Sequence, residues 1–245
     1  MHLNLYTPLV EPILSYMRML RFNGPEQVKR YYRLFGDLEY DLLSLRAENA
    51  VMQIRLREVK RRVLSCVLLS DDEERQINVD SHDLAEHLFD RVERLQRSIA
   101  SSRGFRFDAT REQQSYYLLA DIAYAIMGIE DSAVRARERE TINIACEAYG
   151  RLDLSALIDL HDSVQQFLAL QRRERLDDYE EVEWRKKLEN LQRSHPLCCI
   201  KWLDDPASIT RRLSSLKRKI KSQQAELERV TMVYGAIVTA MRERN

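Results

Sequence analysis

Apolar residues recur at heptad spacing in three long stretches of the chain. The first stretch places these residues at its a and d positions: Leu38, Leu42, Leu45, Asn49, Met52, Leu56, Val59 and Val63. Every position except Asn49 is apolar, which is the pattern of a coiled-coil seam. A buried asparagine in such a seam fixes register or partner number at a cost in stability. An asparagine turned toward solvent has no such role, and the sequence leaves both alternatives open.

Two further seams follow the first. The second contains Ala85, Leu88, Val92, Leu95 and Ile99. The polar segment at residues 70–81 separates it from the first seam, so the two are expected to fold back as an antiparallel helical hairpin. The third contains Ile209, Leu213, Leu216, Ile220, Gln223, Leu227, Val230, Tyr234 and Ile237. Gln223 is the one polar member of this third seam. The nearest candidate to pair with the seam is the preceding helix, through Trp184, Leu188 and Leu191.

Helix start signals divide the chain into segments. Asn23-Gly24-Pro25-Glu26 is typical of a helix start, and Thr110 with Gln113 forms a capping-box pattern. We therefore expect an N-terminal segment at 1–24, a first coiled-coil hairpin arm at 25–103, a helical centre at 104–162 and a second coiled-coil hairpin arm at 163–245. The predicted fold is all-α, with two coiled-coil hairpins flanking a small helical centre.

The composition supports long helices in a reducing environment. The 245 residues include only six glycines and five prolines, so signals for strands and tight turns are scarce. Lysine plus arginine equals aspartate plus glutamate at 39 each, so there is no global attraction to nucleic acid or acidic lipid. Four cysteines are too scattered for a disulfide framework. No stretch reaches about 18 apolar residues, so we expect a cytoplasmic protein without membrane contact.

Patterns that indicate catalysis, cofactor binding or metal binding are missing from the sequence. It contains no Gly-rich phosphate loop, no nucleophile elbow and no histidine pair at i, i+4 spacing. His82 and His87 lie five residues apart and would point to different faces of a helix. His195, Cys198 and Cys199 form a local cluster of soft ligands without a fourth member, so a buried turn is favoured over a zinc site. We expect neither catalysis nor a cofactor or metal.

Two basic stretches, at residues 55–62 and 211–221, raise the alternative of nucleic-acid binding. The side chains that could contact phosphates are Arg211, Arg212, Lys217, Arg218, Lys219 and Lys221. Such contacts would give an affinity that falls steeply with salt. However, Leu216 and Ile220 place the second stretch in a coiled-coil seam, where flanking cations are ordinary, and no aromatic residues are interleaved for base stacking. The sequence therefore favours protein partners over nucleic acid.

The segment ACEAYGRLDLSALIDL, residues 145–160, and the turn at Trp202-Leu203-Asp204-Asp205 carry a family resemblance. Together with the first seam, they resemble blocks of bacterial coiled-coil proteins with a J domain (DnaJ-like). The resemblance extends from about Glu39 to Tyr234. It implies a centre in which a short helix, a His-Pro-Asp loop and a second helix lie between coiled-coil arms.

The loop that activates a DnaK-type chaperone in this family has lost its motif here. The resemblance maps it to these residues: Met127, Gly128, Ile129, Glu130 and Asp131. The preceding stretch from Ser115 to Met127 has no lysine or arginine, although the family presents basic residues there to the chaperone. The resemblance thus implies a degenerate J-like centre that does not stimulate the chaperone ATPase. We expect a non-catalytic scaffold or adaptor that binds proteins: a second copy of itself or, weakly, a DnaK-type chaperone.

Overall fold

The computed structural model describes residues 10–65, 69–106, 108–127, 132–168 and 179–243. Every regular element in these ranges is a helix, which confirms the predicted all-α fold. The elements are α1 (Val10–Arg18), the π-helical turn η1 (Met19–Asn23), α2 (Gly24–Leu64), α3 (Asp71–Arg103), α4 (Ala109–Met127), α5 (Ser132–Arg151), α6 (Leu154–Leu168), α7 (Tyr179–Arg193), the 3-10 turn η2 (Leu197–Trp202) and α8 (Pro206–Arg242). Among the described helices, none combines the length and the apolar character needed to cross a bilayer.

The helices divide into two compact units, each built from two separate stretches of the chain. The core unit comprises Met1–Val28 and Phe105–Ile200, and the arm comprises Lys29–Gly104 and Lys201–Asn245. The second stretch of the core unit thus interrupts the arm between α3 and α8. This division differs from the predicted one, which gave residues 163–245 a hairpin of their own.

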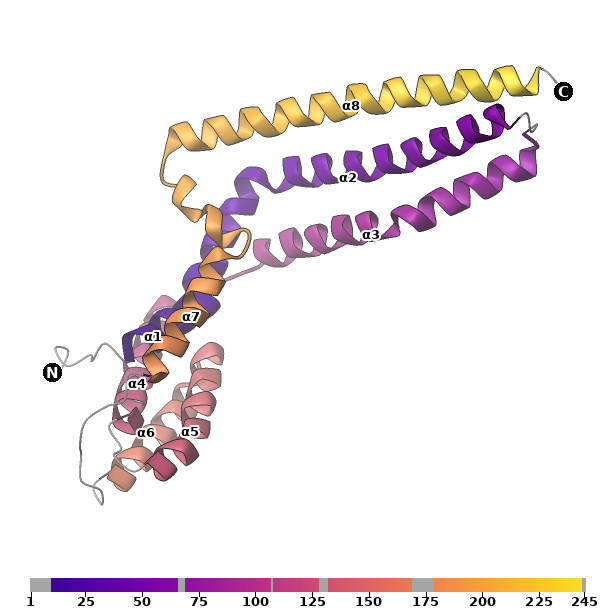
Figure 1. Cartoon of the computed structure of the whole chain (residues 1–245). Coiled ribbons are helices and arrows are strands. Elements are labelled where there is room, and N and C mark those ends of the chain that lie inside the picture. The colour runs from indigo at the N-terminus through magenta and orange to yellow at the C-terminus, as the bar shows by residue number, and fades with distance from the viewer. Residues whose placement is uncertain (1–9, 66–68, 107, 128–131, 169–178, 244–245) are drawn as a thin grey trace. The chain divides into compact units, whose positions relative to one another are not determined.

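Helices α2 and α3 of the arm run antiparallel (Figure 1). Arg55 Nε donates to Ser81 Oγ at 3.1 Å, and Arg62 Nη1 lies 2.7 Å from Glu73 Oε1. Residues later in α2 therefore face residues earlier in α3. A capping box at Ser70 starts α3: its hydroxyl accepts from the Glu73 N–H, and the Glu73 carboxylate accepts from the Ser70 N–H.

Helix α8 lies parallel to α2 in the arm, at a constant offset along the sequence. Glu39 Oε1 lies 2.7 Å from Arg212 Nη2, a separation of 173 residues. Asn49 Nδ2 donates to the main-chain oxygen of Gln223 at 2.9 Å, a separation of 174 residues. The constant offset means that one register holds along this length of the two helices.

The third seam therefore pairs with α2 and α3 rather than with α7. Helix α7 packs against α1 in the core unit, where the ring centroids of Trp184 in α7 and Tyr16 in α1 lie 5.5 Å apart. The physical reason lies in the two polar seam positions. Asn49 is only 4% exposed, and besides the main-chain oxygen its amide donor reaches Gln223 Oε1, an acceptor that an apolar residue at position 223 would not offer.

The predicted seam residues are buried to different degrees. Leu42, Asn49, Val59 and Leu216 are buried, and these are half-buried: Leu38, Leu45, Met52, Leu56, Leu213, Ile220 and Leu227. At the end of the arm, one apolar cluster joins α2, α3 and α8 through Val59, Leu69, Ile77, Val238 and Met241.

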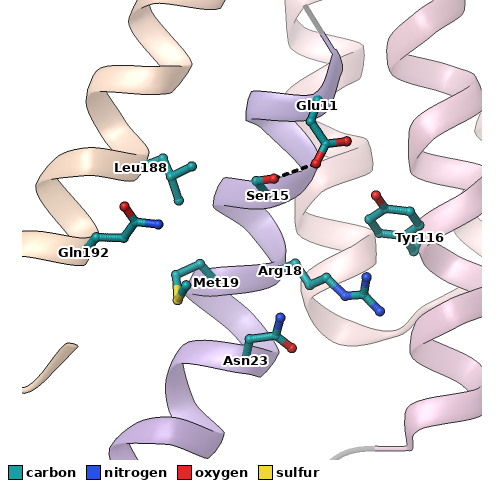
Figure 2. A pocket seen from close by; sticks show the side chains of 8 residues that line it. All are labelled: Glu11, Ser15, Arg18, Met19, Asn23, Tyr116, Leu188 and Gln192. Atoms are coloured by element: carbon teal, nitrogen blue, oxygen red, sulfur yellow. Dashed lines mark hydrogen bonds between the residues drawn. The ribbon is translucent and has the colours of Figure 1, made fainter. Parts of the chain in front are cut away.

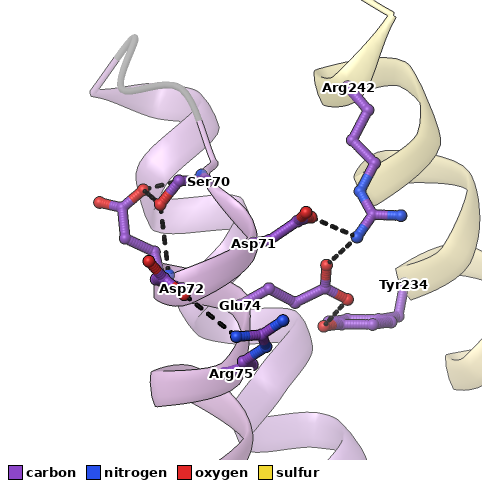
Figure 3. A network of polar contacts seen from close by, with 8 residues as sticks. Ser70, Asp71, Asp72, Glu74, Arg75, Tyr234 and Arg242 are labelled. Atoms are coloured by element: carbon purple, nitrogen blue, oxygen red, sulfur yellow. Dashed lines mark hydrogen bonds and ion pairs between the residues drawn. The ribbon is translucent and has the colours of Figure 1, made fainter.

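A polar cluster also lies at that end of the arm (Figure 3). Arg242 Nη2 of α8 lies 3.0 Å from Asp71 Oδ1 and 2.7 Å from Glu74 Oε2, and the Tyr234 hydroxyl donates to Glu74 Oε1 at 3.3 Å. These contacts fix α8 to the first turn of α3. The three helices consequently form one bundle rather than a hairpin with a loose third member.

The core unit packs α1, α4, α5, α6 and α7 around one apolar core. Its largest fully buried side chains are Ile13, Leu14, Leu119, Ile122, Ile126, Tyr149 and Leu157. Helix α4 lies at the centre, because it packs against α1, α5 and α6, while α7 packs against α1. This arrangement leaves one face of α1 between α4 and α7.

The junction between α1 and α2 is a π-helical turn rather than a fresh helix start. The Gly24 N–H bonds to the Met19 oxygen, five residues back. Pro25 has no N–H to donate, so an ordinary i to i−4 bond is impossible at that position. A Cβ on Gly24 would lie 2.1 Å from the Met19 oxygen, which only glycine avoids. The Asn23-Gly24-Pro25-Glu26 segment therefore continues a helix in which the register shifts by one residue.

Candidate functional site

A polar pocket with a volume of about 310 Å³ opens on the core unit (Figure 2). Its lining residues are Glu11, Ser15, Arg18, Met19, Asn23, Tyr116, Leu188 and Gln192. The first five follow one face of α1 and η1, Tyr116 comes from α4, and the last two come from α7. Its size suits a small ligand, and π-helical turns such as η1 are frequent at functional sites.

A buried carboxylate fixes the cation of this pocket. Glu112 is 3% exposed, and its carboxylate meets Arg18 side-on, with Nε–Oε1 at 3.1 Å and Nη2–Oε2 at 3.2 Å. The Tyr149 hydroxyl donates to Glu112 Oε1 at 2.5 Å. Burial raises the pKa of Tyr149 well above its ordinary value, and the hydrogen bond to Glu112 adds to the rise. The phenol thus remains a hydrogen-bond donor across the physiological pH range.

The pocket can bind a polar group through several donors. The Arg18 guanidinium lies 4.8 Å above the Tyr116 ring centroid and donates one hydrogen bond to Glu112, from Nη2, out of the five N–H groups that a guanidinium carries. The Asn23 and Gln192 amides have no hydrogen-bond partner in the described part of the chain. Ser15 Oγ donates to Glu11 Oε1 at 2.9 Å. The chemistry offered is recognition by hydrogen bonds and charge.

The sequence carries no local signal for this pocket. Arg18 and Glu112 are 94 residues apart, and Glu112 and Tyr149 are 37 residues apart. Glu112 has the sequence appearance of an acid in the first turn of a helix, where exposure is usual. No residue near Tyr149 or Arg18 in the sequence indicates that either side chain contacts a buried carboxylate.

The predicted J-like loop lies mostly outside the described residues. Met127 ends α4 and is 2% exposed, whereas Gly128, Ile129, Glu130 and Asp131 fall in the undescribed segment. Helices α4 and α5 flank this segment and pack against each other.

The soft-ligand cluster at η2 does not assemble as a metal site. Cys198 Sγ and Cys199 Sγ lie 3.6 Å apart, with Cys199 buried and Cys198 exposed. His82 packs against Phe89, at 5.6 Å between ring centroids. Across the described residues, no three histidine, cysteine or acidic side chains come together in a way that could hold a metal ion.

The two basic stretches differ in how far the arm neutralises them. In the first, Arg61 pairs with Glu58 at 2.7 Å, and Arg55 and Arg62 contact α3. In the second, Arg211 lies 3.5 Å from Asp205, and Arg212 pairs with Glu39. Exposed cations that form no ion pair within the described residues remain in both stretches: Arg57 and Lys60 in the first, and Lys217, Arg218, Lys219 and Lys221 in the second.

Comparisons of the chain with protein-family models, with curated proteins and with solved structures found no match.

Proposed function

We propose that the protein is a non-catalytic scaffold that binds protein partners through the outer faces of its arm. The Asn49–Gln223 pair is the observation that carries this proposal. Because the Asn49 amide donor is bound by Gln223 of the same chain, this polar seam position has a partner without a second copy of the protein. Partners then have the outward faces available, on helices of 41, 33 and 37 residues.

Exposed apolar side chains mark where such partners would bind. Leu84 of α3 is 66% exposed and Met232 of α8 is 69% exposed, although both helices bury apolar residues elsewhere. Burying a large apolar side chain contributes about 1.5–3 kcal/mol, so both positions can stabilise a complex. The proposed site of action is the cytoplasm.

The J-like relationship is part of the proposal. The succession of α4 and α5 supports it, as does the segment at residues 145–160, which falls in α5 and α6. In α4, the stretch from Ser115 to Met127 has Asp121 as its only charged residue. An acidic chaperone surface would find no complementary charge there. The core unit is proposed to bind a DnaK-type chaperone weakly at most, without triggering it.

Single-turnover ATP hydrolysis by the host's DnaK-type chaperone tests the J-like part. The chaperone is assayed alone, with this protein, and with an intact J protein. We expect stimulation only by the intact J protein. Clear stimulation by this protein would overturn the assignment of a degenerate loop.

Photo-crosslinking in host cells tests the scaffold part. A crosslinking amino acid is placed at position 84 or 232, and at position 97 as an exposed polar control. We expect a discrete protein adduct from the first two positions, and binding of the purified partner that is lost in Leu84→Ser/Met232→Ser. Equal adducts at all three positions, or binding that survives both substitutions, would contradict the proposal.

A further inference from the structure

The first half of α8 carries positive charge that the arm leaves unneutralised. From Pro206 to Ala225 the helix has six lysines and arginines and no aspartate or glutamate. Arg211 and Arg212 are paired, as described above. Lys217, Arg218, Lys219 and Lys221 are exposed without ion pairs in the described part of the chain. At about 100° per residue they spread over the outward half of α8, with Lys217 and Lys221 close together and Lys219 turned toward the side on which Arg212 meets α2.

Helix α2 adds a fifth cation beside them. Arg46 follows Glu39 by seven residues, which is about two helical turns, so the two side chains lie on the same face of α2. Because Glu39 pairs with Arg212, this face of α2 lies along α8. At the offset of 174 residues, Arg46 stands level with Ile220. Arg46 is exposed, and no described residue forms an ion pair with it.

The nearest acids of α2 lie on its other side. Glu48 lies seven residues before Arg55, which hydrogen-bonds to Ser81 of α3, so Glu48 shares the α3 side. Asp41 lies seven residues before Glu48 and follows the same line. These two carboxylates of α2 therefore do not neutralise the cations along α8.

We propose that the face formed by Arg46, Lys217, Arg218, Lys219 and Lys221 binds the phosphate backbone of double-stranded nucleic acid, without sequence selectivity. Leu216 is 1% exposed and Ile220 is half-buried, so the apolar face of α8 is covered and cannot insert into a lipid surface. No aromatic residue lies between Pro206 and Ala225 to stack on unpaired bases, as single-strand binding usually requires. Among the exposed large apolar residues, only Met232 lies on α8, beyond this face, so a protein hot spot is not formed there.

The inference is independent of the scaffold function and reverses the preference drawn from the sequence alone. The seam argument against nucleic acid holds for Leu216 and Ile220, which turn inward. The same geometry turns the lysines outward. With about four phosphates contacted, the logarithm of the binding constant should fall with that of the salt concentration with a slope of about −3.6.

Fluorescence anisotropy of the full chain with a labelled DNA duplex, across a salt series, tests the inference. We expect a dissociation constant of about 10⁻⁴ to 10⁻⁶ M near physiological salt. Lys217→Gln/Lys221→Gln should weaken binding at least about tenfold at low salt and reduce the slope by about 1.8. Arg61→Gln/Arg97→Gln removes the same charge from the arm at cations already paired with Glu58 and Glu93, and should leave both quantities unchanged.

Helical content and thermal midpoint, measured by circular dichroism, establish that both variants remain folded. The same titrations with single-stranded DNA, polyglutamate and vesicles containing phosphatidylserine separate the sources of negative charge. Duplex binding tighter than all three supports the inference. Absence of duplex binding at low salt, equal losses in the two double variants, or tighter binding to any of the other three ligands would overturn it.

Discussion

The side chain of Asn49 in α2 donates to both oxygen atoms that Gln223 of α8 presents. The distance from Asn49 Nδ2 is 2.9 Å to the main-chain oxygen and 3.2 Å to Oε1. Each residue is the single polar member of its own seam, and the two lie 174 residues apart in sequence. The pair fixes where along α2 the third helix of the arm packs.

Replacing either member alone should destabilise the arm. In Asn49→Ala, the Gln223 side chain loses its donor in a largely apolar seam, and we expect the free energy of unfolding to fall by about 1–3 kcal/mol. The double variant Asn49→Leu/Gln223→Leu leaves neither side chain without a partner. Its free energy of unfolding should therefore fall by less than the sum of the losses in Asn49→Leu and Gln223→Leu. Urea unfolding of the four proteins measures the coupling, with Gln224→Leu, at an exposed position, as the control. Purely additive losses would show that the two residues act independently.

Two glycines in helices should respond to alanine in opposite directions. In Gly24→Ala, the new Cβ meets the Met19 oxygen, so the π-helical turn must rearrange at a cost of about 1–3 kcal/mol. A Cβ at Gly235 in α8 meets nothing within 4 Å, so Gly235→Ala should raise the free energy of unfolding by about 0.5–1 kcal/mol. Thermal unfolding of both variants provides the test. A loss at both positions would mean that Gly235 has a role beyond the packing of this chain.

The ion pair beneath the pocket should stabilise the core unit through mutual compensation. Arg18→Met leaves the Glu112 carboxylate buried without a cation, and we expect a loss of about 2–4 kcal/mol, reduced from the fully buried case because Arg18 is partly exposed. Arg18→Met/Glu112→Gln should recover part of that loss. Arg111→Met removes an exposed arginine from α4 and should change stability by less than about 0.5 kcal/mol. If the double variant is less stable than Arg18→Met, the compensation argument fails.

The Cys146 thiol should be inert in the folded protein and should link stability to alkaline pH. Burial raises its pKa to about 12, while the charges of Lys187 and Arg21 act in the opposite direction. Its contribution to stability is therefore complete below pH 9 and is lost as pH rises from 9 toward 12. Between these pH values, the free energy of unfolding should fall by about 1.4 kcal/mol per pH unit because of this thiol. In Cys146→Ala this fall should disappear and the pH dependence should flatten.

Thiol labelling gives a second measurement of the same property. At neutral pH, the exposed Cys198 should react quickly and Cys146 only as fast as the core unit opens. Cys198→Ala should remove the contribution of Cys198 to the fast phase and leave the alkaline stability profile unchanged. Fast labelling of Cys146 in the folded protein would contradict its burial.

The fold class follows from the sequence because local terms dominate it: few glycines and prolines, and apolar residues at heptad spacing. The sequence marks Asn49 and Gln223 as the polar members of their seams. It does not predict their pairing, because the preceding helix lies nearer to the third seam along the chain. One unmatched polar residue in each of two long seams is itself a pairing signal. The triad of Arg18, Glu112 and Tyr149 carried no such signal, since its members become neighbours only through tertiary packing.

The interrupted arm has a consequence for the order in which the protein is synthesised. Helix α8 follows α3 by about 100 residues, so at 5–20 residues per second the ribosome finishes the hairpin of α2 and α3 about 5–20 seconds before its third helix exists. During that interval the groove that later receives Leu216, Val230 and Val238 is open to water. A nascent chain in this state is the form most prone to aggregate and the form on which a general chaperone would act. The apolar surface of α2 and α3 is covered only after α8, the last helix, has been synthesised.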